Sequence, residues 1–275
     1  MIFMKCNLSL NIFIYMAFSI LFFSSCEKEK ISQPNTEAGK IVFKFNQTYN
    51  GQPIIYDSLL YVNAAGNKLM IDQIQYFISD VTLHKSGGGL KILNSKEFCH
   101  YIDKDIPSTL TWSPADVIAT GAYDSISFTF GLSKIENKTG LFVNPPENNM
   151  SWPEMLGGGY HYMKMNLKFQ DSTNYLSPFN FHLGIGQIYN SKDSIIGFVQ
   201  NYFNVTLPNS SFVIENGKTK EIQIIMNVES WFKTPHIFDF NQWEMPGMMG
   251  IMQNETGMKA ACDNGFDVFT IGYIK

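Results

Sequence analysis

Apolar and polar residues alternate with a period of two along most of the chain after residue 39. The clearest run is 163–170 (MKMNLKFQ), in which every second side chain is apolar. This period is typical of a β-strand that buries one face. The same alternation recurs at 41–45, 74–78, 126–130, 179–183, 222–228 and 269–273. We therefore expect a protein built largely from strands.

Turn-forming residues separate these runs, as at Asn50-Gly51 and Asn216-Gly217. A helix is expected near the end of the chain, where Asn254 would cap it and Asn264-Gly265 would end it. No repeat and no break in composition divides the sequence. The pattern predicts an all-β fold, an antiparallel β-sandwich with short helical segments, forming a single domain over residues 39–275.

The N-terminal segment differs from the rest of the sequence. Lys5 precedes a mostly apolar stretch that ends at Ser24-Ser25-Cys26, and the charged residues 27–30 follow at once. This resembles the lipobox of bacterial lipoproteins, with Phe23 where leucine is commoner. We expect residues 1–25 to be a signal peptide, and residues 26–38 to be a lipidated Cys26 with a polar tether. An ordinary signal peptide or an uncleaved anchor would also give this pattern.

Composition and charge narrow the class of protein. Apolar residues make up 45% of the chain and charged residues only 16%, so a sizeable core can form. The net charge is −4 without a basic block, which argues against binding of nucleic acid. Nucleotide-binding loops, HExxH, CxxCH and GxSxG motifs are all absent from the sequence. We therefore expect a protein that is not an enzyme.

Two cysteines remain once Cys6 and Cys26 are assigned to the N-terminal segment. An exported protein can keep a disulfide, so we expect a bridge between Cys99 and Cys262. The long loop that it closes would stabilise the fold by on the order of 4–5 kcal/mol. A soft-metal pair is the alternative, but the sequence has no CxxC spacing.

Three of the five histidines have suggestive neighbours. His161 has the parity of Met163 and so points to the buried face, or lies just off its end. His182 has the opposite parity to Phe181 and is expected on the polar face. His236 follows Pro235 near a Trp-Phe pair. Each could be a hydrogen-bonded structural histidine, but together they suggest a metal site.

Methionine is the second candidate ligand type. The chain has 14 methionines, and five of them crowd residues 245–258. Thioethers are soft ligands that suit copper(I), which makes Met252 a candidate. The alternative is that these side chains fill the core.

Several segments resemble the MbnP-like periplasmic copper-binding protein family, which is common among Bacteroidota lipoproteins. They follow one another along the chain in the same order as in that family. The most specific segment runs from Met150-Ser151-Trp152 to Gly159-Tyr160-His161 and on to 181–184 (FHLG). The others are 39–45, 61–66, 74–80, 123–131, 251–254 and 264–269. Together they span most of the chain after the tether.

The resemblance implies a β-sandwich that binds copper outside the cytoplasm. It places His161 and His182 at histidine positions near the family's metal region. It also makes Trp152 the candidate for oxidation to kynurenine by a dihaem peroxidase-like partner. The family's second tryptophan is missing here, where the chain reads WPEM, and Met155 is a candidate ligand in its place.

The sequence thus predicts a non-catalytic, envelope-anchored lipoprotein that binds copper for acquisition or handling. It would face the periplasm or the cell surface from the outer membrane. The alternative is an accessory lipoprotein without a metal, acting with an outer-membrane transporter or a surface complex.

Overall fold

The computed structural model describes residues 37–94, 97–245 and 248–275. Residues 37–275 form one compact unit. The expected signal peptide, Cys26 and nearly all of the tether lie outside the described residues. Within the described part, no helix is long and apolar enough to cross a membrane.

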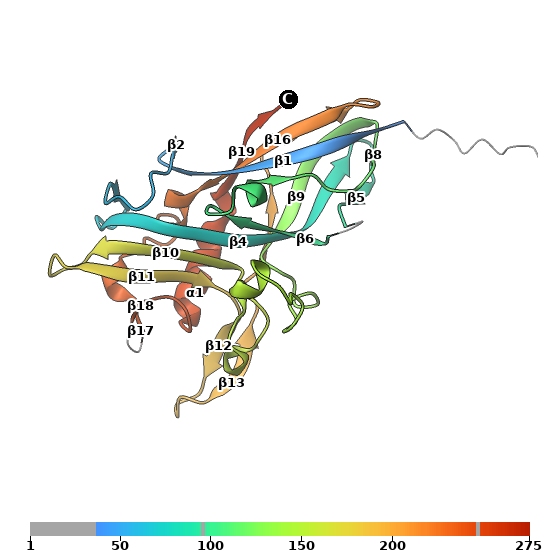
Figure 1. Cartoon of the computed structure of the whole chain (residues 1–275). Helices are drawn as coiled ribbons and strands as arrows, with labels where there is room; N and C mark the ends of the chain where they lie inside the picture. Colours follow the sequence, from blue (N-terminus) through green and yellow to red (C-terminus); the bar gives the residue numbers. More distant parts are fainter. Residues whose placement is uncertain (1–36, 95–96, 246–247) are drawn as a thin grey trace, which may run out of the picture. The chain divides into compact units, whose positions relative to one another are not determined.

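Two sheets and one separate hairpin make up the fold (Figure 1). The smaller sheet has the order β19-β16-β1-β2, with β7 and β8 also paired to β1. Its strands are β1 (Ala38–Tyr49), β2 (Gln52–Pro53), β7 (Thr111–Trp112), β8 (Ile118–Ala119), β16 (Thr219–Asn227) and β19 (Phe269–Ile274).

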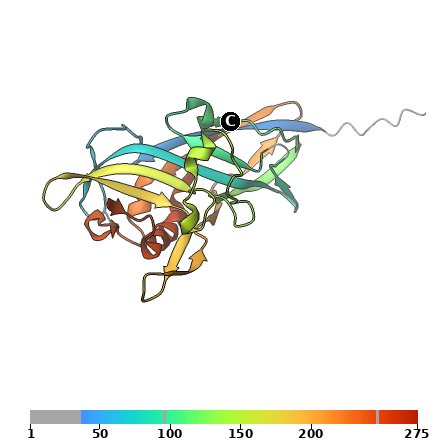
Figure 2. The same ribbon diagram turned by 60° about the horizontal axis from the view of Figure 1, so that its bottom comes forward.

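The larger sheet has the order β14-β9-β4-β10-β11-β18-β17, and β15, β3, β5 and β6 pair with its members. Its strands are β3 (Tyr61–Val62), β4 (Lys68–Lys85), β5 (Leu90–Ile92), β6 (Cys99–Asp103), β9 (Gly121–Phe130), β10 (Met163–Gln170), β11 (Leu176–Leu183), β14 (Phe203–Thr206), β15 (Phe212–Ile214), β17 (Glu244–Met245) and β18 (Met248–Gly250). The hairpin of β12 (Gly186–Tyr189) and β13 (Ile195–Val199) projects from this body (Figure 2).

The helical segments are short. Helix α1 (Glu255–Asn264) begins where the sequence predicts, because the Asn254 side chain accepts a hydrogen bond of 2.9 Å from the Gly257 amide. The 3-10 turns are η1 (Pro107–Leu110), η2 (Glu147–Met150), η3 (Glu154–Leu156), η4 (Val228–Phe232), η5 (Phe240–Gln242) and η6 (Gly265–Asp267).

The all-β, single-domain prediction is confirmed, but the sheets are mixed rather than purely antiparallel. Strand β1 runs parallel to β16, with Phe43 opposite Ile222, and β11 runs parallel to β18. Parallel neighbours need a long connection. Here β16 reaches β1 only after the chain has built most of the larger sheet, and side-chain alternation carries no information about that order.

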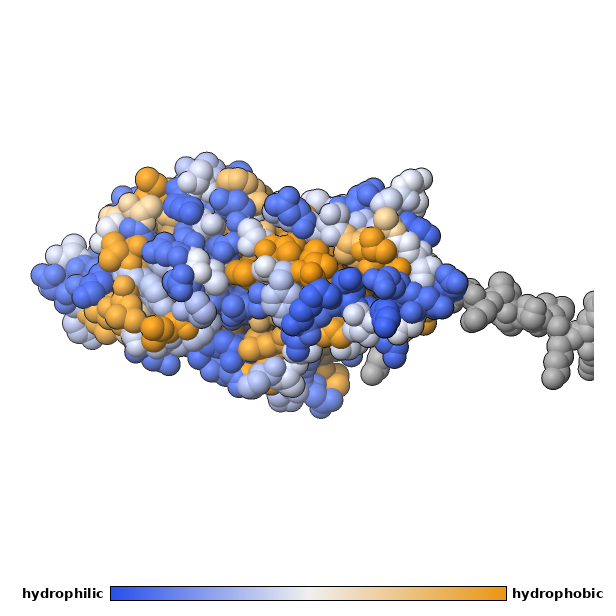
Figure 3. All heavy atoms as spheres, turned by 90° about the horizontal axis from the view of Figure 1, so that it is seen from above, coloured by the Kyte–Doolittle hydropathy of each residue, from blue (hydrophilic) through white to orange (hydrophobic). Residues whose placement is uncertain are grey.

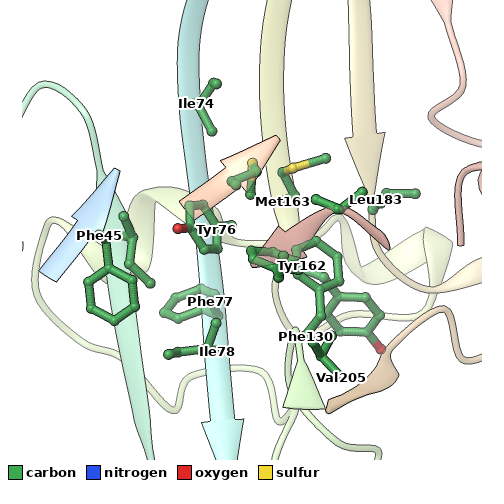
Figure 4. Close-up of a cluster of buried hydrophobic side chains, with 14 of the residues drawn as sticks. Phe45, Ile74, Tyr76, Phe77, Ile78, Phe130, Tyr162, Met163, Leu183 and Val205 are labelled. Atoms are coloured by element: carbon green, nitrogen blue, oxygen red, sulfur yellow. The ribbon is translucent and has the colours of Figure 1, made fainter. Parts of the chain in front are cut away.

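The core lies between the two sheets and is rich in aromatic rings. Phe269 of the smaller sheet contacts Tyr76, Phe128 and Phe130 of the larger one, with ring centroids 5.2–6.0 Å apart. Figure 4 shows Tyr76 and Phe130 among these buried side chains. The alternating strands thus bury their apolar faces against each other, as the period of two predicts. On the face seen in Figure 3, hydrophobic residues gather in separate patches among hydrophilic ones.

The predicted disulfide between Cys99 and Cys262 is wrong, because both cysteines are free in the structure. Cys99 lies on β6 opposite Ser79, whereas Cys262 lies on α1 and donates its Sγ–H to the Asn201 carbonyl at 3.1 Å. Burial raises the pKa of the Cys262 thiol to about 12, and that of Cys99 as well. A pair of cysteines in a chain expected to be exported is therefore not enough to predict a bridge.

Candidate metal centre

A glycine-rich loop places His161 at the start of β10. Gly157, Gly158 and Gly159 have positive φ angles of 116°, 68° and 79°. A Cβ on Gly159 would lie 2.5 Å from the Asn137 side chain, so only glycine fits there. The two ends of the loop lie side by side, because the backbone amide of Trp152 donates to the Gly159 carbonyl at 2.8 Å.

The His161 ring has one nitrogen held by the backbone. Its Nδ1 lies 2.9 Å from the Met150 carbonyl oxygen, which can only accept, so Nδ1 carries the proton. The His161 amide donates to the same oxygen at 2.7 Å. The side chain is only 6% exposed. Nε2 therefore keeps its lone pair and is the ring nitrogen that can bind a metal.

The His182 ring is held in the opposite way. Its Nε2 lies 2.7 Å from Asn166 Oδ1, and Asn166 Nδ2 donates to Gln73 Oε1 at 3.0 Å. With the Asn166 amide in this orientation, Oδ1 accepts and His182 Nε2 carries the proton. His182 Nδ1 is buried without any hydrogen-bond partner in the described structure. A buried unpaired nitrogen is costly unless a ligand uses it.

The two imidazoles meet at the ends of paired strands. Their ring centroids are 5.3 Å apart and nearly perpendicular, at 85°. The Trp152 ring lies 4.6 Å from that of His161 and donates Nε1–H to the Leu156 carbonyl at 3.1 Å. A Cβ on Gly184 would lie 2.6 Å from the Trp152 ring, so this glycine lets the indole cover the site.

Alternation predicted opposite faces for the two histidines, and the structure shows why they still meet. His182 does point away from the Phe181 face, toward the side of its cross-strand partner Lys164. However, the loop with Trp152 covers that side, so His182 is only 8% exposed. β10 begins at Met163, after a bend at Tyr162, so its alternation does not extend back to His161.

Electrostatics keep both rings neutral. Burial lowers the pKa of His161 to about 4, and it lowers the pKa of His182 well below its ordinary value. The charge of Lys164 lowers both further, and its ammonium donates to the Asn149 carbonyl at 3.3 Å. Neutral imidazoles with a fixed proton on the far nitrogen are suited to metal binding. The pair fits a soft ion that accepts few ligands, such as copper(I).

The other predicted ligands do not join this pair. The His236 ring is paired with Asp263 at 3.1 Å beside α1, and Met155 is 80% exposed on η3. Met252 packs against the hydrophobic core, as the core-filling alternative holds. No group of three or more His, Cys, Asp or Glu residues capable of holding a metal occurs in the described part of the chain.

Sequence reasoning missed the groups that orient the pair. Asn166 and Lys164 share the polar face of the 163–170 run. The alternation of apolar and polar residues predicted that this face is exposed to solvent. The Met150 carbonyl leaves no signal in the sequence, because any residue would supply it. Asn166 could have been found from its diagonal position relative to His182 across the β10–β11 pair.

This chain resembles known proteins in both its sequence and its fold. The sequence model of the MbnP family matches residues 38–252. The chain belongs to the MbnP family. The MbnP match includes His161, His182 and Trp152, and it ends before α1.

A solved structure of MbnP from Methylosinus trichosporium has a similar fold. Its TM-score is 0.50 at 12% sequence identity, with 73% of this chain and 79% of that chain covered. At this identity the likeness concerns the fold alone. Among curated proteins, no match was found.

The lowered histidine pKa values predict how the affinity for a copper(I) ion, if one binds between the two rings, would depend on pH. An exposed pair with pKa 6.5 would lose roughly a hundredfold in affinity between pH 7 and 5.5, because both rings would gain protons. Here the pKa of His161 is about 4 and that of His182 is also depressed, so both rings stay neutral. We expect the copper(I) affinity to change less than about threefold over that range. Competition titrations with a chelator calibrated at each pH would measure it, and a hundredfold loss would contradict the burial argument.

Proposed function

We propose that this protein binds one copper(I) ion between His161 Nε2 and His182 Nδ1, as a non-catalytic copper-binding lipoprotein of the cell envelope. The observation that carries the proposal is the buried, unpartnered Nδ1 of His182, beside a second imidazole whose Nε2 has the lone pair. Membership of a family linked to copper handling supports it.

The chemistry of the donors favours copper(I) over harder ions. The two rings contact each other and His161 also contacts Trp152, and among the described residues no carboxylate bonds to either ring. Calcium and magnesium require several oxygen ligands, and structural zinc usually takes four ligands. Copper(I) accepts imidazole and has a single charge, which the nearby Lys164 ammonium opposes less than it opposes a divalent ion.

The direct test is a copper(I) titration of the purified domain against a chromogenic chelator, under reducing conditions. We expect one copper(I) per chain, with zinc and calcium failing to displace it. Binding at no site, or at several sites of similar affinity, would contradict the proposal. A protein without copper binding would instead favour an accessory role beside a transporter or a surface complex.

The charge of Lys164 is expected to weaken cation binding at the pair. A unit charge a few ångströms away is worth about 1 kcal/mol even in high dielectric. Lys164→Gln should therefore tighten copper(I) binding by roughly fivefold. Lys168→Gln is the matched control, because Lys168 follows four residues later on the same strand and pairs instead with Asp72 at 3.2 Å. Equal copper(I) affinities in the wild type and Lys164→Gln would show that the charge of Lys164 does not weaken binding at the pair.

Anchoring and partnership remain part of the proposal. Lipid attached to Cys26 would hold the domain at the outer membrane, and a dihaem peroxidase-like protein or an outer-membrane transporter would be its partner. Trp152 is placed beside His161, where oxidation of the indole would alter the surroundings of the bound ion. Radioactive palmitate labelling of the wild type, lost in Cys26→Ser, would test the anchor. Mass spectrometry of the peptide containing Trp152 would test the modification.

A further inference from the structure

A cavity of about 550 Å³ lies between β6, η1 and the segment 141–147. This volume falls within the range of small-molecule sites. Its lining includes the buried side chains of Phe77, Tyr101 and Cys99. The cavity does not include His161, His182 or Trp152, so it is separate from the metal centre.

Aromatic rings form its walls and are held by one another. Phe77 stacks on Phe142 at 5.4 Å and 8°, and it contacts Tyr101 at 5.4 Å. Phe142 in turn packs edge-on against Tyr160 at 4.8 Å. Phe98 adds a fourth ring to the lining. Phe77 and Tyr101 are buried, so the half-buried rings of Phe98 and Phe142 are the ones that a ligand can reach. The contacts of Phe142 with Phe77 and Tyr160 fix its ring before any ligand arrives, which lowers the entropic cost of binding.

The charged side chains that line the cavity are both acidic. Glu97 and Glu147 line the cavity, no Lys or Arg does so, and neither carboxylate has an ion-pair partner in the described structure. The imidazole of His100 is neutral there, because burial lowers its pKa to about 4. Burial raises the pKa of the Cys99 thiol, and the charges of Glu136, Glu97 and Glu147 raise it further.

We propose that this cavity binds a small organic cation, an ammonium or quaternary ammonium group attached to an apolar body. Ring faces attract such cations through their quadrupole, and aromatic cages are the usual means of recognising quaternary ammonium groups. The two carboxylates supply the balancing charge, and an organic anion of the same size would be repelled.

The cavity adjoins the metal centre through η2. Glu147, at the start of η2, lines the cavity, while the carbonyl of Met150, at its end, holds His161 Nδ1. The proposal does not depend on copper, because neither His161 nor His182 lines the cavity. Binding of the cation can therefore be tested on the metal-free protein.

The experiment uses calorimetric titration of the folded protein with phenyltrimethylammonium, and with benzenesulfonate as the anionic counterpart. We expect saturable binding of the cation with a Kd of about 1 mM or tighter, and none of the anion. The double variant Glu97→Gln/Glu147→Gln should weaken cation binding by about tenfold. The matched control is Glu215→Gln, an exposed carboxylate outside the cavity, which should leave it unchanged.

A second variant, Phe142→Leu, removes a ring face while keeping an apolar side chain. We expect it to weaken the cation by several-fold. Circular dichroism and an unchanged urea midpoint would show that these variants fold. Absence of saturable cation binding, equal binding of benzenesulfonate, or an unaltered affinity in the double glutamate variant would each overturn the proposal. Any of these outcomes would leave the copper proposal intact, because that proposal is tested by the histidine variants.

Discussion

His182→Ala is expected to abolish tight copper(I) binding while the protein stays folded. The substitution removes one of the two imidazole donors, and the one that remains cannot hold the ion alone. Loss of a partner outside the ligands already costs 10–100-fold in metal affinity, so loss of a ligand should cost at least about a hundredfold. The fold should lose only about 1–2 kcal/mol, because the hydrogen bond to Asn166 is lost while Nδ1 made none.

The matched control for this variant is His236→Ala. His236 is a surface histidine whose ring is paired with Asp263, away from the histidine pair. We expect its copper(I) affinity to equal that of the wild type in the same chelator competition. A loss in His236→Ala as large as in His182→Ala would mean that the assigned pair is wrong.

Trp231→Ala is expected to have the largest effect on stability. Trp231 is fully buried and contacts the rings of Phe130, Phe181 and Phe203, at centroid distances of 5.2, 6.0 and 6.2 Å. Truncation leaves a large cavity in a core of rigid aromatic rings, which typically costs 3–5 kcal/mol. Urea unfolding followed by far-UV circular dichroism would measure the loss.

Phe266→Ala is the control for this variant, since Phe266 is 68% exposed and its removal leaves no cavity. Its effect should stay within about 0.5 kcal/mol. A loss below about 1 kcal/mol in Trp231→Ala would show that the core between the sheets is not packed as described. Phe181 precedes His182 on β11, so the same core also supports the strand that carries this proposed metal ligand.

Periodicity predicted the strands because burial of one face leaves a two-residue signature. The run at 163–170 became β10 as expected, with its apolar residues buried. Periodicity could not predict that β1 and β16 run parallel, because that depends on the path of the chain between them. Nor could it show that Cys99 on β6 and Cys262 on α1 are both free thiols.

The candidate site was predictable in part. The identities of His161 and His182 came from the sequence and its family resemblance, and the structure brings their rings together. Their burial was harder to foresee, because the polar side of β11 is covered by a loop more than 20 residues earlier in the chain. Trp152 on that loop packs over Gly184, a long-range contact that alternation within a strand cannot report. For the same reason Met155, which follows on the loop, faces solvent rather than the pair.

The most direct measurement is nitrogen-15 NMR of the imidazoles, recorded before and after addition of copper(I). The account predicts an Nδ1–H tautomer for His161 and an Nε2–H tautomer for His182 in the metal-free protein. Copper(I) should then shift His161 Nε2 and His182 Nδ1 strongly, while the protonated nitrogens and the His236 ring change little. Unshifted resonances of His161 and His182, or a shift centred on His236, would contradict the assignment of this pair as the copper site.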